Sequence, residues 1–187
     1  MIPHPGQFFA SRSDSLIGEA IQKAELLHQK RMHHLKDNDV MFNHIGGFIM
    51  HKGILCVAEA LTTGFTIHPW IGSEYQTKKT EYIILELYKP FDFETLLKYT
   101  KTIESYEGCP YDFVGIIDSL DFAIDGRWNG EINQKAQDKM FCSEAIATGI
   151  NEYHKGIFPY PWCVSPQLFI ENTNLVVIKN QPFYEKS

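Results

Sequence analysis

Apolar side chains recur at helical spacing in three stretches of the chain. In residues 16–36 they alternate with Lys, Glu and Gln, behind a Ser-Asp-Ser segment that can cap a helix. The same spacing recurs over 93–107 and over 141–154, and a glycine follows each of these two stretches. The pattern therefore predicts three helices.

Shorter apolar runs, rich in aromatic and β-branched residues, predict strands. They occupy residues 7–10, 42–50, 54–60, 82–88 and 174–179. Only His51-Lys52-Gly53 separates the second run from the third, which is typical of a β-hairpin with a glycine-bearing turn. Helices that alternate with such strands predict an α+β fold with an antiparallel sheet.

The composition suits one folded unit and disfavours two classes of partner. At 187 residues and 44% hydrophobic content, the chain can build one core but is short for two, so we expect a single domain over 1–187. A net charge of -6 opposes nucleic-acid binding, which needs a basic face. No apolar stretch approaches the roughly 20 residues that span a bilayer, so we expect a soluble protein with no membrane insertion.

The amino terminus lacks the basic-then-apolar order of a secretory signal. The sequence as written therefore predicts a cytoplasmic protein, and an extracytoplasmic location would require that a signal peptide has been removed. No feature of the sequence specifies an oligomeric state.

The cysteines give little support for disulfides or structural zinc. They stand at Cys56, Cys109, Cys142 and Cys163. They are unevenly spaced and none forms a CxxC pair, so we expect free thiols and no zinc site. One reactive cysteine is compatible with this pattern.

The histidines give equally little support for a metal or another cofactor. A cluster at His28, His33 and His34 lies on a polar helix tail, where solvated side chains are the usual finding. We therefore predict no cofactor. We assign no function to the histidines that adjoin turns or the ends of elements, which are His51, His68 and His154.

Three residues have the chemistry of a nucleophile, a base and an orienting acid. Cys142 falls in the first turn of a predicted helix, where free backbone amides and the helix dipole favour a thiolate. His44 precedes two glycines in an apolar strand, which is typical of an imidazole with open space beside it. Glu59 interrupts the next apolar run, where a carboxylate needs a partner. Each alone also fits a plain core position, a small buried cysteine being the commoner finding.

The hairpin register decides whether these residues can act together. A two-residue turn at 52–53 places Glu59 opposite Gly46 and makes His44 its diagonal neighbour on the same face. The carboxylate can then orient the imidazole, which can take the proton of Cys142. A three-residue loop would shift the register by one residue and send Glu59 to the other face.

Five short motifs resemble, in this order, those of one family. They are His44-Ile45-Gly46, Val57-Ala58-Glu59-Ala60, Tyr111-Asp112-Phe113, Phe141-Cys142-Ser143-Glu144 and Val164-Ser165-Pro166-Gln167. Together they resemble the permuted NlpC-type papain-like family, in its YiiX-like branch, over nearly the whole chain. The resemblance implies a circularly permuted papain-like α+β fold, in which an antiparallel sheet packs against helices. The nucleophile then lies at a helix N-terminus, and the histidine strand precedes the cysteine helix.

The resemblance also implies a role for each residue of the site. Cys142 is then the nucleophile, His44 the base and Glu59 the third polar residue. Tyr111 lines the site or supports the oxyanion through its hydroxyl, unless it is a core tyrosine. Trp162 lies in a proline-rich segment and can form a wall of the substrate groove or pack in the core.

We therefore expect a cysteine peptidase or amidase that cleaves an amide bond through an acyl-enzyme. The resemblance implies a small peptide-like substrate, with a cell-wall peptide as the favoured case. Two other functions stay open. One is a thiol-dependent acyltransferase or a lipid-directed acyl hydrolase, and the other is a non-catalytic peptide-binding module.

Overall fold

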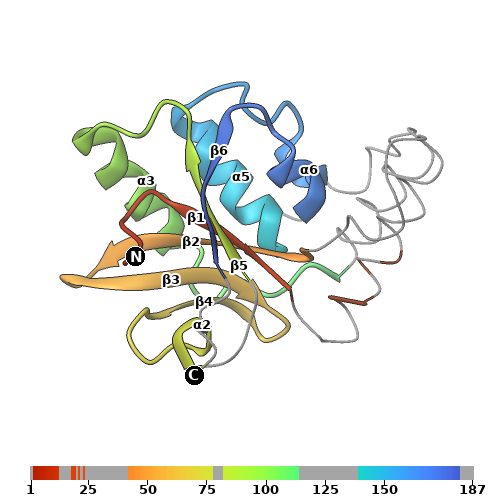
Figure 1. The fold of residues 1–187 in the computed structure, drawn as a ribbon, viewed down its shortest axis with the longest axis horizontal. Coiled ribbons are helices and arrows are strands. Elements are labelled where there is room, and N and C mark those ends of the chain that lie inside the picture. The colour runs from red at the N-terminus through yellow and green to blue at the C-terminus, as the bar shows by residue number, and fades with distance from the viewer. Residues whose placement is uncertain are drawn as a thin grey trace.

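A six-stranded antiparallel sheet organises the part of the chain that the structure describes (Figure 1). The computed structural model describes residues 2–12, 18–19, 21, 23, 42–77, 82–113 and 139–181. The strands are β1 (Phe8–Ser11), β2 (His44–His51), β3 (Ile54–Leu61), β4 (Gly64–Pro69), β5 (Tyr82–Leu87) and β6 (Leu175–Gln181). Their order across the sheet is β4-β3-β2-β1-β5-β6, so β1 and β2 lie at its centre.

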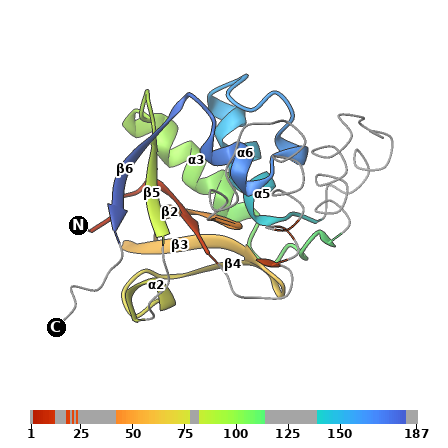
Figure 2. The same ribbon diagram turned by 45° about the vertical axis from the view of Figure 1, so that its right-hand side comes forward.

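The helices cover the two faces of the sheet unequally. They are α2 (Glu74–Thr77), α3 (Phe93–Ser105), α5 (Cys142–Tyr153) and α6 (Pro166–Ile170), with a 3₁₀ turn η2 at Pro161–Cys163. Figures 1 and 2 show α3, α5 and α6 on one face, and the short α2 on the other side, next to β4. The fold is therefore α+β. Within the described ranges, no helix is long and apolar enough to cross a bilayer.

Alternation along the strands builds a separate apolar cluster on each face. On β1, Phe8 belongs to the cluster under the helices, together with Ile45 and Ile146. Its neighbour Phe9 belongs to the cluster on the other face, with Trp70 as one of its partners. Successive side chains of a strand point to opposite faces, so two adjacent phenylalanines anchor both clusters.

The β2–β3 hairpin has the register that a two-residue turn predicts. Lys52 and Gly53 both have positive φ, at 50° and 81°, as the type I′ turn of a tight hairpin requires. Gly46 is therefore paired with Glu59. This confirms the register that places Glu59 on the face of His44.

Most of the predicted elements are present in the structure. The described parts of the strands and the helices over 93–107 and 141–154 agree within a few residues. The helix expected over 16–36 lies largely outside the described residues, and those described, at 18–19, 21 and 23, are helical. The pattern missed β4, α2 and α6. Cys56, Cys109 and Cys142 are free thiols, as expected.

Candidate active site

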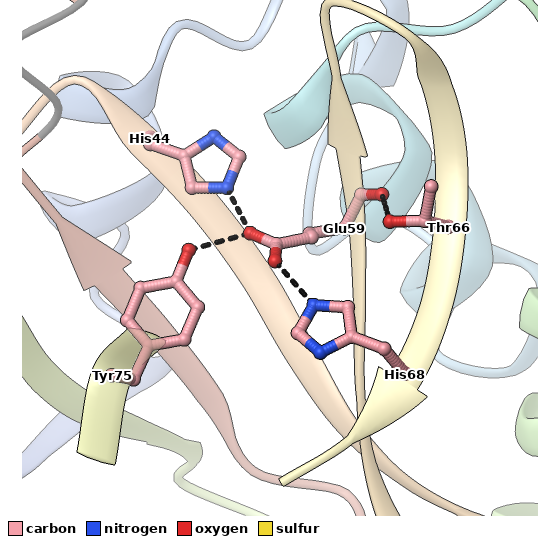
Figure 3. A network of polar contacts seen from close by, with 5 residues as sticks. All are labelled: His44, Glu59, Thr66, His68 and Tyr75. Carbon is pink, nitrogen blue, oxygen red and sulfur yellow. Dashed lines mark hydrogen bonds and ion pairs between the residues drawn. The ribbon is translucent and has the colours of Figure 1, made fainter. Parts of the chain in front are cut away.

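His44 and Glu59 form a buried ion pair at the start of the central hairpin. The Nε2–H of His44 donates to Oε2 of Glu59 over 2.6 Å. Glu59 is 1% exposed and His44 is 9% exposed, so solvent screens this contact little. The second ring nitrogen of His44 points away from Glu59 and is left for another partner (Figure 3).

Glu59 accepts hydrogen bonds from three side chains of three different elements (Figure 3). Besides His44, Tyr75 of α2 donates its hydroxyl to Oε2 over 2.5 Å, and His68 of β4 donates Nε2–H to Oε1 over 2.7 Å. Burial alone would raise the pKa of Glu59, but these hydrogen bonds and the charge of His44 lower it to about 2. The sequence predicts that the Glu59 carboxylate has a partner, and the structure gives it three.

Cys142 is the first residue of α5 and meets the imidazole of His44. The thiol is buried and hydrogen-bonds the His44 side chain. Burial alone would raise the pKa of Cys142, but the hydrogen bond and charge of His44, with the backbone amides of Ile45 and Ser143, lower it. Since Nε2 of His44 donates to Glu59, Nδ1 of His44 is the nitrogen that interacts with the Cys142 sulfur.

The imidazole is poised between two negative groups. Burial alone would lower the pKa of His44, but hydrogen bonds and charge attraction from Cys142 and Glu59 outweigh it and raise that pKa to about 10. A buried thiolate–imidazolium pair is the protonation state that this geometry favours. The structure therefore brings Cys142, His44 and Glu59 into one continuous hydrogen-bonded chain.

Tyr111 joins this chain from the side of the sulfur. A parallel bridge pairs Tyr111 with Met140, which lies two residues before Cys142. The bridge therefore brings Tyr111 close to the start of α5. The Tyr111 hydroxyl hydrogen-bonds Cys142, and burial together with the thiolate charge raises the pKa of Tyr111 well above its usual range. The hydroxyl therefore stays protonated and donates to the sulfur.

Trp162 lies on a segment that is held beside the nucleophile. It belongs to η2, which packs against α5. The hydroxyl of Ser143, next to Cys142, donates to the carbonyl oxygen of Val164 over 2.6 Å and anchors this segment. The partly buried Trp162 ring contacts Tyr160, with ring centroids 5.8 Å apart. Its role as a groove wall stays a prediction.

With this geometry in place, the chain can be compared with known proteins. No protein-family model matches the chain, and no curated protein matches it either. The fold is similar to that of YiiX. The crystal structure of metalloprotein YiiX from Escherichia coli O157:H7 matches with a TM-score of 0.54 and 21% sequence identity, covering 96% of this chain and 98% of that chain. At this identity the similarity to YiiX concerns the fold alone.

The two glycines after His44 have a different role from the one expected. The sequence suggested open space beside the imidazole, but a Cβ on Gly46 would lie 2.3 Å from the Phe9 ring. That ring packs on His44 and Tyr75, at centroid distances of 6.0 and 4.5 Å. Gly47 similarly makes room for the Tyr99 hydroxyl, 3.2 Å from its ideal Cβ. Gly46 therefore allows an aromatic ring to support the site, whereas Gly47 makes room for Tyr99 in the cluster under the helices.

Sequence reasoning missed two of the side chains that hold Glu59, His68 and Tyr75. We assigned His68 no function, and the structure places it against Glu59. In the β3–β4 pairing Thr66 is opposite Glu59, so His68 is a diagonal neighbour of Glu59, as His44 is on the other side. The sequence offered one signal for the position of His68, which was a second tight hairpin turn at 62–63. It offered no signal for Tyr75, because α2 is a single short turn outside the sheet.

A second acid near the nucleophile was also missed. Glu144 lies in the first turn of α5 and accepts the backbone N–H of Phe141 over 3.3 Å. Burial, followed by the negative charges of Asp112 and Cys142, raises the pKa of Glu144 to about 8. This carboxyl is therefore largely protonated at neutral pH and adds no full negative charge beside the thiolate.

Proposed function

We propose that this chain is a cysteine hydrolase with a circularly permuted papain-like site, and that residues 1–187 form one hydrolase domain. Its reaction is the cleavage of an amide bond in a peptide-like substrate, with a cell-wall peptide as the favoured case. One observation carries the proposal. A buried thiol at a helix N-terminus hydrogen-bonds an imidazole whose other nitrogen is held by a buried carboxylate.

The order of the elements also supports the class. The histidine strand β2 precedes the cysteine helix α5 in the chain, which is the order of the permuted arrangement. The similarity to YiiX concerns the overall fold and bears neither on the chemistry nor on the permuted papain-like assignment.

Acylation begins with attack of the Cys142 thiolate on the substrate carbonyl carbon. The carbonyl oxygen becomes an oxyanion, for which we assign the backbone N–H of Cys142 as one donor, since first-turn amides lack intrahelical acceptors. The Tyr111 hydroxyl, which donates to the sulfur before attack, is freed as the sulfur loses its charge. It can then turn to the oxyanion.

Collapse of this intermediate breaks the C–N bond. His44 gives its Nδ1 proton to the leaving amine, and a thioester remains on Cys142. Neutral His44 then takes a proton from water, and the hydroxide attacks the thioester. Departure of the acid restores the thiolate and the imidazolium, and Glu59 keeps Nε2–H of His44 in the required tautomer throughout.

YiiX is described as a metalloprotein, so we tested the residues of this chain against a metal site. The described residues contain no group of three or more His, Cys, Asp or Glu side chains with the geometry to hold an ion. The oxygens of Glu59 instead point at protonated donors, two of them histidine nitrogens at 2.6 and 2.7 Å. These residues do not fit a metal centre, and no step of the proposal passes through one.

Turnover of defined amides tests the proposal. The native protein is incubated with purified cell-wall peptides and with a panel of acyl-amides, and the products are read by mass spectrometry. We expect a new carboxylate and a new amine from the native protein and neither from Cys142→Ala. Cys109→Ala serves as the matched control, because Cys109 is a free thiol with no part in the chain of contacts described above.

The same product analysis separates the alternatives. An acyl group found on an added amine or alcohol, in preference to water, would identify an acyltransferase, and acyl release from a lipid donor would identify a lipid-directed enzyme. A peptide that binds with no product in either protein would identify a binding module. Turnover that survives in a clean Cys142→Ala preparation would refute the cysteine mechanism.

A further inference from the structure

Glu59 lies between two histidines that approach it from opposite neighbouring strands. His44 on β2 binds Oε2 and His68 on β4 binds Oε1, so each carboxylate oxygen has its own imidazole (Figure 3). Both histidines are diagonal neighbours of Glu59 in the sheet. The proposed reaction uses only His44, which leaves His68 without a role.

The two oxygens are anchored differently. Tyr75 shares Oε2 with His44, and both burial and the charge of Glu59 raise the pKa of Tyr75, so its hydroxyl stays neutral. His68 is the main side-chain donor to Oε1. Of these four residues His68 is also the most exposed, since 33% of its side chain is accessible, compared with 1% for Glu59. It can therefore exchange its proton with solvent while the rest of the network stays buried.

The groups that face His68 favour its charged form. Glu59 on β3 contributes most, followed by the carbonyl of Pro69 on its own strand and then by Glu74 on α2. His44 on β2 is a positive group on the other side of the carboxylate. The hydrogen bond to Glu59 is the largest cause, and it outweighs the opposing effect of burial, so the pKa of His68 is raised above its usual value. These contacts favour the protonated form of His68.

We propose that His68 is a positioning residue of the candidate site, which fixes the plane of the Glu59 carboxylate and widens the pH range of the thiolate–imidazolium pair. This inference rests on the proposed function. The terminal torsion of a glutamate is soft, so contacts on one oxygen leave the carboxylate plane free to turn. A donor on the second oxygen removes that freedom and keeps Oε2 directed at His44.

The charge of His68 then acts at both ends of the pH range. In acid, protonated His68 adds positive charge to the site and favours loss of the Cys142 proton, so the thiolate forms at lower pH. Above its own pKa, neutral His68 still donates Nε2–H but leaves the full negative charge of Glu59 to hold the His44 imidazolium. A donor that is always neutral would hold the Glu59 carboxylate but would not favour the thiolate in acid.

The variants His68→Ala and His68→Gln separate the donor from the charge. Alanine removes both, whereas the glutamine amide places an N–H near the position of Nε2 without a charge. His51→Gln is the matched control, because His51 makes a 2.7 Å contact with Glu104 at the far end of β2. That end lies roughly 23 Å along the strand from His44. Thermal unfolding of each variant checks that the fold is retained.

The readout is the rate of iodoacetamide labelling at Cys142 as a function of pH, resolved by mass spectrometry. We expect His68→Ala to lower the rate at neutral pH by about 5- to 10-fold, because it leaves a buried carboxylate oxygen without its donor. We expect His68→Gln to restore that rate to within about twofold, while the acid limb in both variants moves up by about half to one pH unit. His51→Gln should keep the native profile.

Several outcomes would overturn the inference. A native rate and acid limb in His68→Ala would show that the donor and the charge are both irrelevant. A glutamine variant as slow as the alanine variant would refute the donor role, and an unmoved acid limb in a folded His68→Gln would refute the charge role. If Cys142 of the native protein titrates as an ordinary thiol, the proposed function itself fails. If the pKa of Cys142 is depressed in the native protein and His68→Ala leaves the labelling profile unchanged, this inference is contradicted and the proposed function is not.

Discussion

Replacing Glu59 by glutamine removes one charge from the centre of the network and little else. Glutamine has the same shape, and its amide oxygen can take the place of Oε2, where it accepts from His44 and Tyr75. Its NH₂ group then faces His68, which can accept it as the neutral tautomer with the proton on Nδ1. We therefore expect Glu59→Gln to fold with the hydrogen-bond pattern largely intact.

The loss of charge has a large effect on His44. An opposite charge in direct contact shifts a pKa by about 1 to 3 units, and each unit corresponds to about 1.4 kcal/mol. The pKa of His44, raised to about 10 by Cys142 and Glu59, should fall accordingly, because its burial then opposes the charged form. The equilibrium between thiolate–imidazolium and thiol–imidazole should move about 10- to 1000-fold toward the neutral pair.

Iodoacetamide labelling of Cys142 across pH measures this shift. The shape of the profile is the relevant quantity, since the buried sulfur makes every absolute rate low. We expect the native profile to be flat around neutral pH, and that of Glu59→Gln to rise only near the ordinary thiol pKa of about 8.5. Glu104→Gln is the matched control, since it neutralises the carboxylate of α3 that contacts His51 at the far end of β2. A flat native-like profile in a folded Glu59→Gln would refute the reasoning.

Three further perturbations test separate parts of the site and its surroundings. Gly46→Ala places a Cβ against the Phe9 ring and should destabilise the fold by about 1 to 3 kcal/mol in urea unfolding; an unchanged midpoint would contradict the packing argument. Tyr111→Phe removes a donor to the thiolate and should raise the pKa of Cys142 by about half a unit, and a lowered pKa would count against that contact. Folding raises the pKa of Glu144 from 4.5 to about 8, so the free energy of unfolding should fall by up to about 1.4 kcal/mol per pH unit as the pH rises through that window. Glu144→Gln should abolish that slope in pH-dependent urea unfolding, and a slope that persists would show that another group causes it.

The central hairpin shows how much of the site local patterns can specify. Two apolar runs and a two-residue turn fix the register of β2 and β3, and the alternation of strands then places Glu59 beside His44. The helix pattern places Cys142 in the first turn of α5 in the same way. These are short-range features, and they were sufficient to identify Cys142, His44 and Glu59 as candidates.

The remainder of the network depends on features that periodicity does not show. The strand β4 contains Thr, His and Pro and lies at an edge of the sheet, so its apolar pattern is weak. Tyr75 reaches Glu59 from a single turn of helix whose position is set by packing of Trp70 and Phe9 on the second face of the sheet. The contact of Tyr111 with Cys142 depends on a single bridge to Met140. Such contacts arise only when the whole chain has folded.

The most direct test of the central claim is the ultraviolet absorbance of the Cys142 thiolate, titrated with pH. It is obtained as the difference between the native protein and Cys142→Ser, and the same titration is repeated in the His44→Ala background. Because absorbance needs no reagent to enter the site, the burial of the sulfur does not affect it. We predict a thiolate that persists well below the ordinary thiol pKa of about 8.5, and we expect His44→Ala to return the pKa to or above that value. A native thiolate that appears only near or above the ordinary value would contradict the thiolate–imidazolium pair.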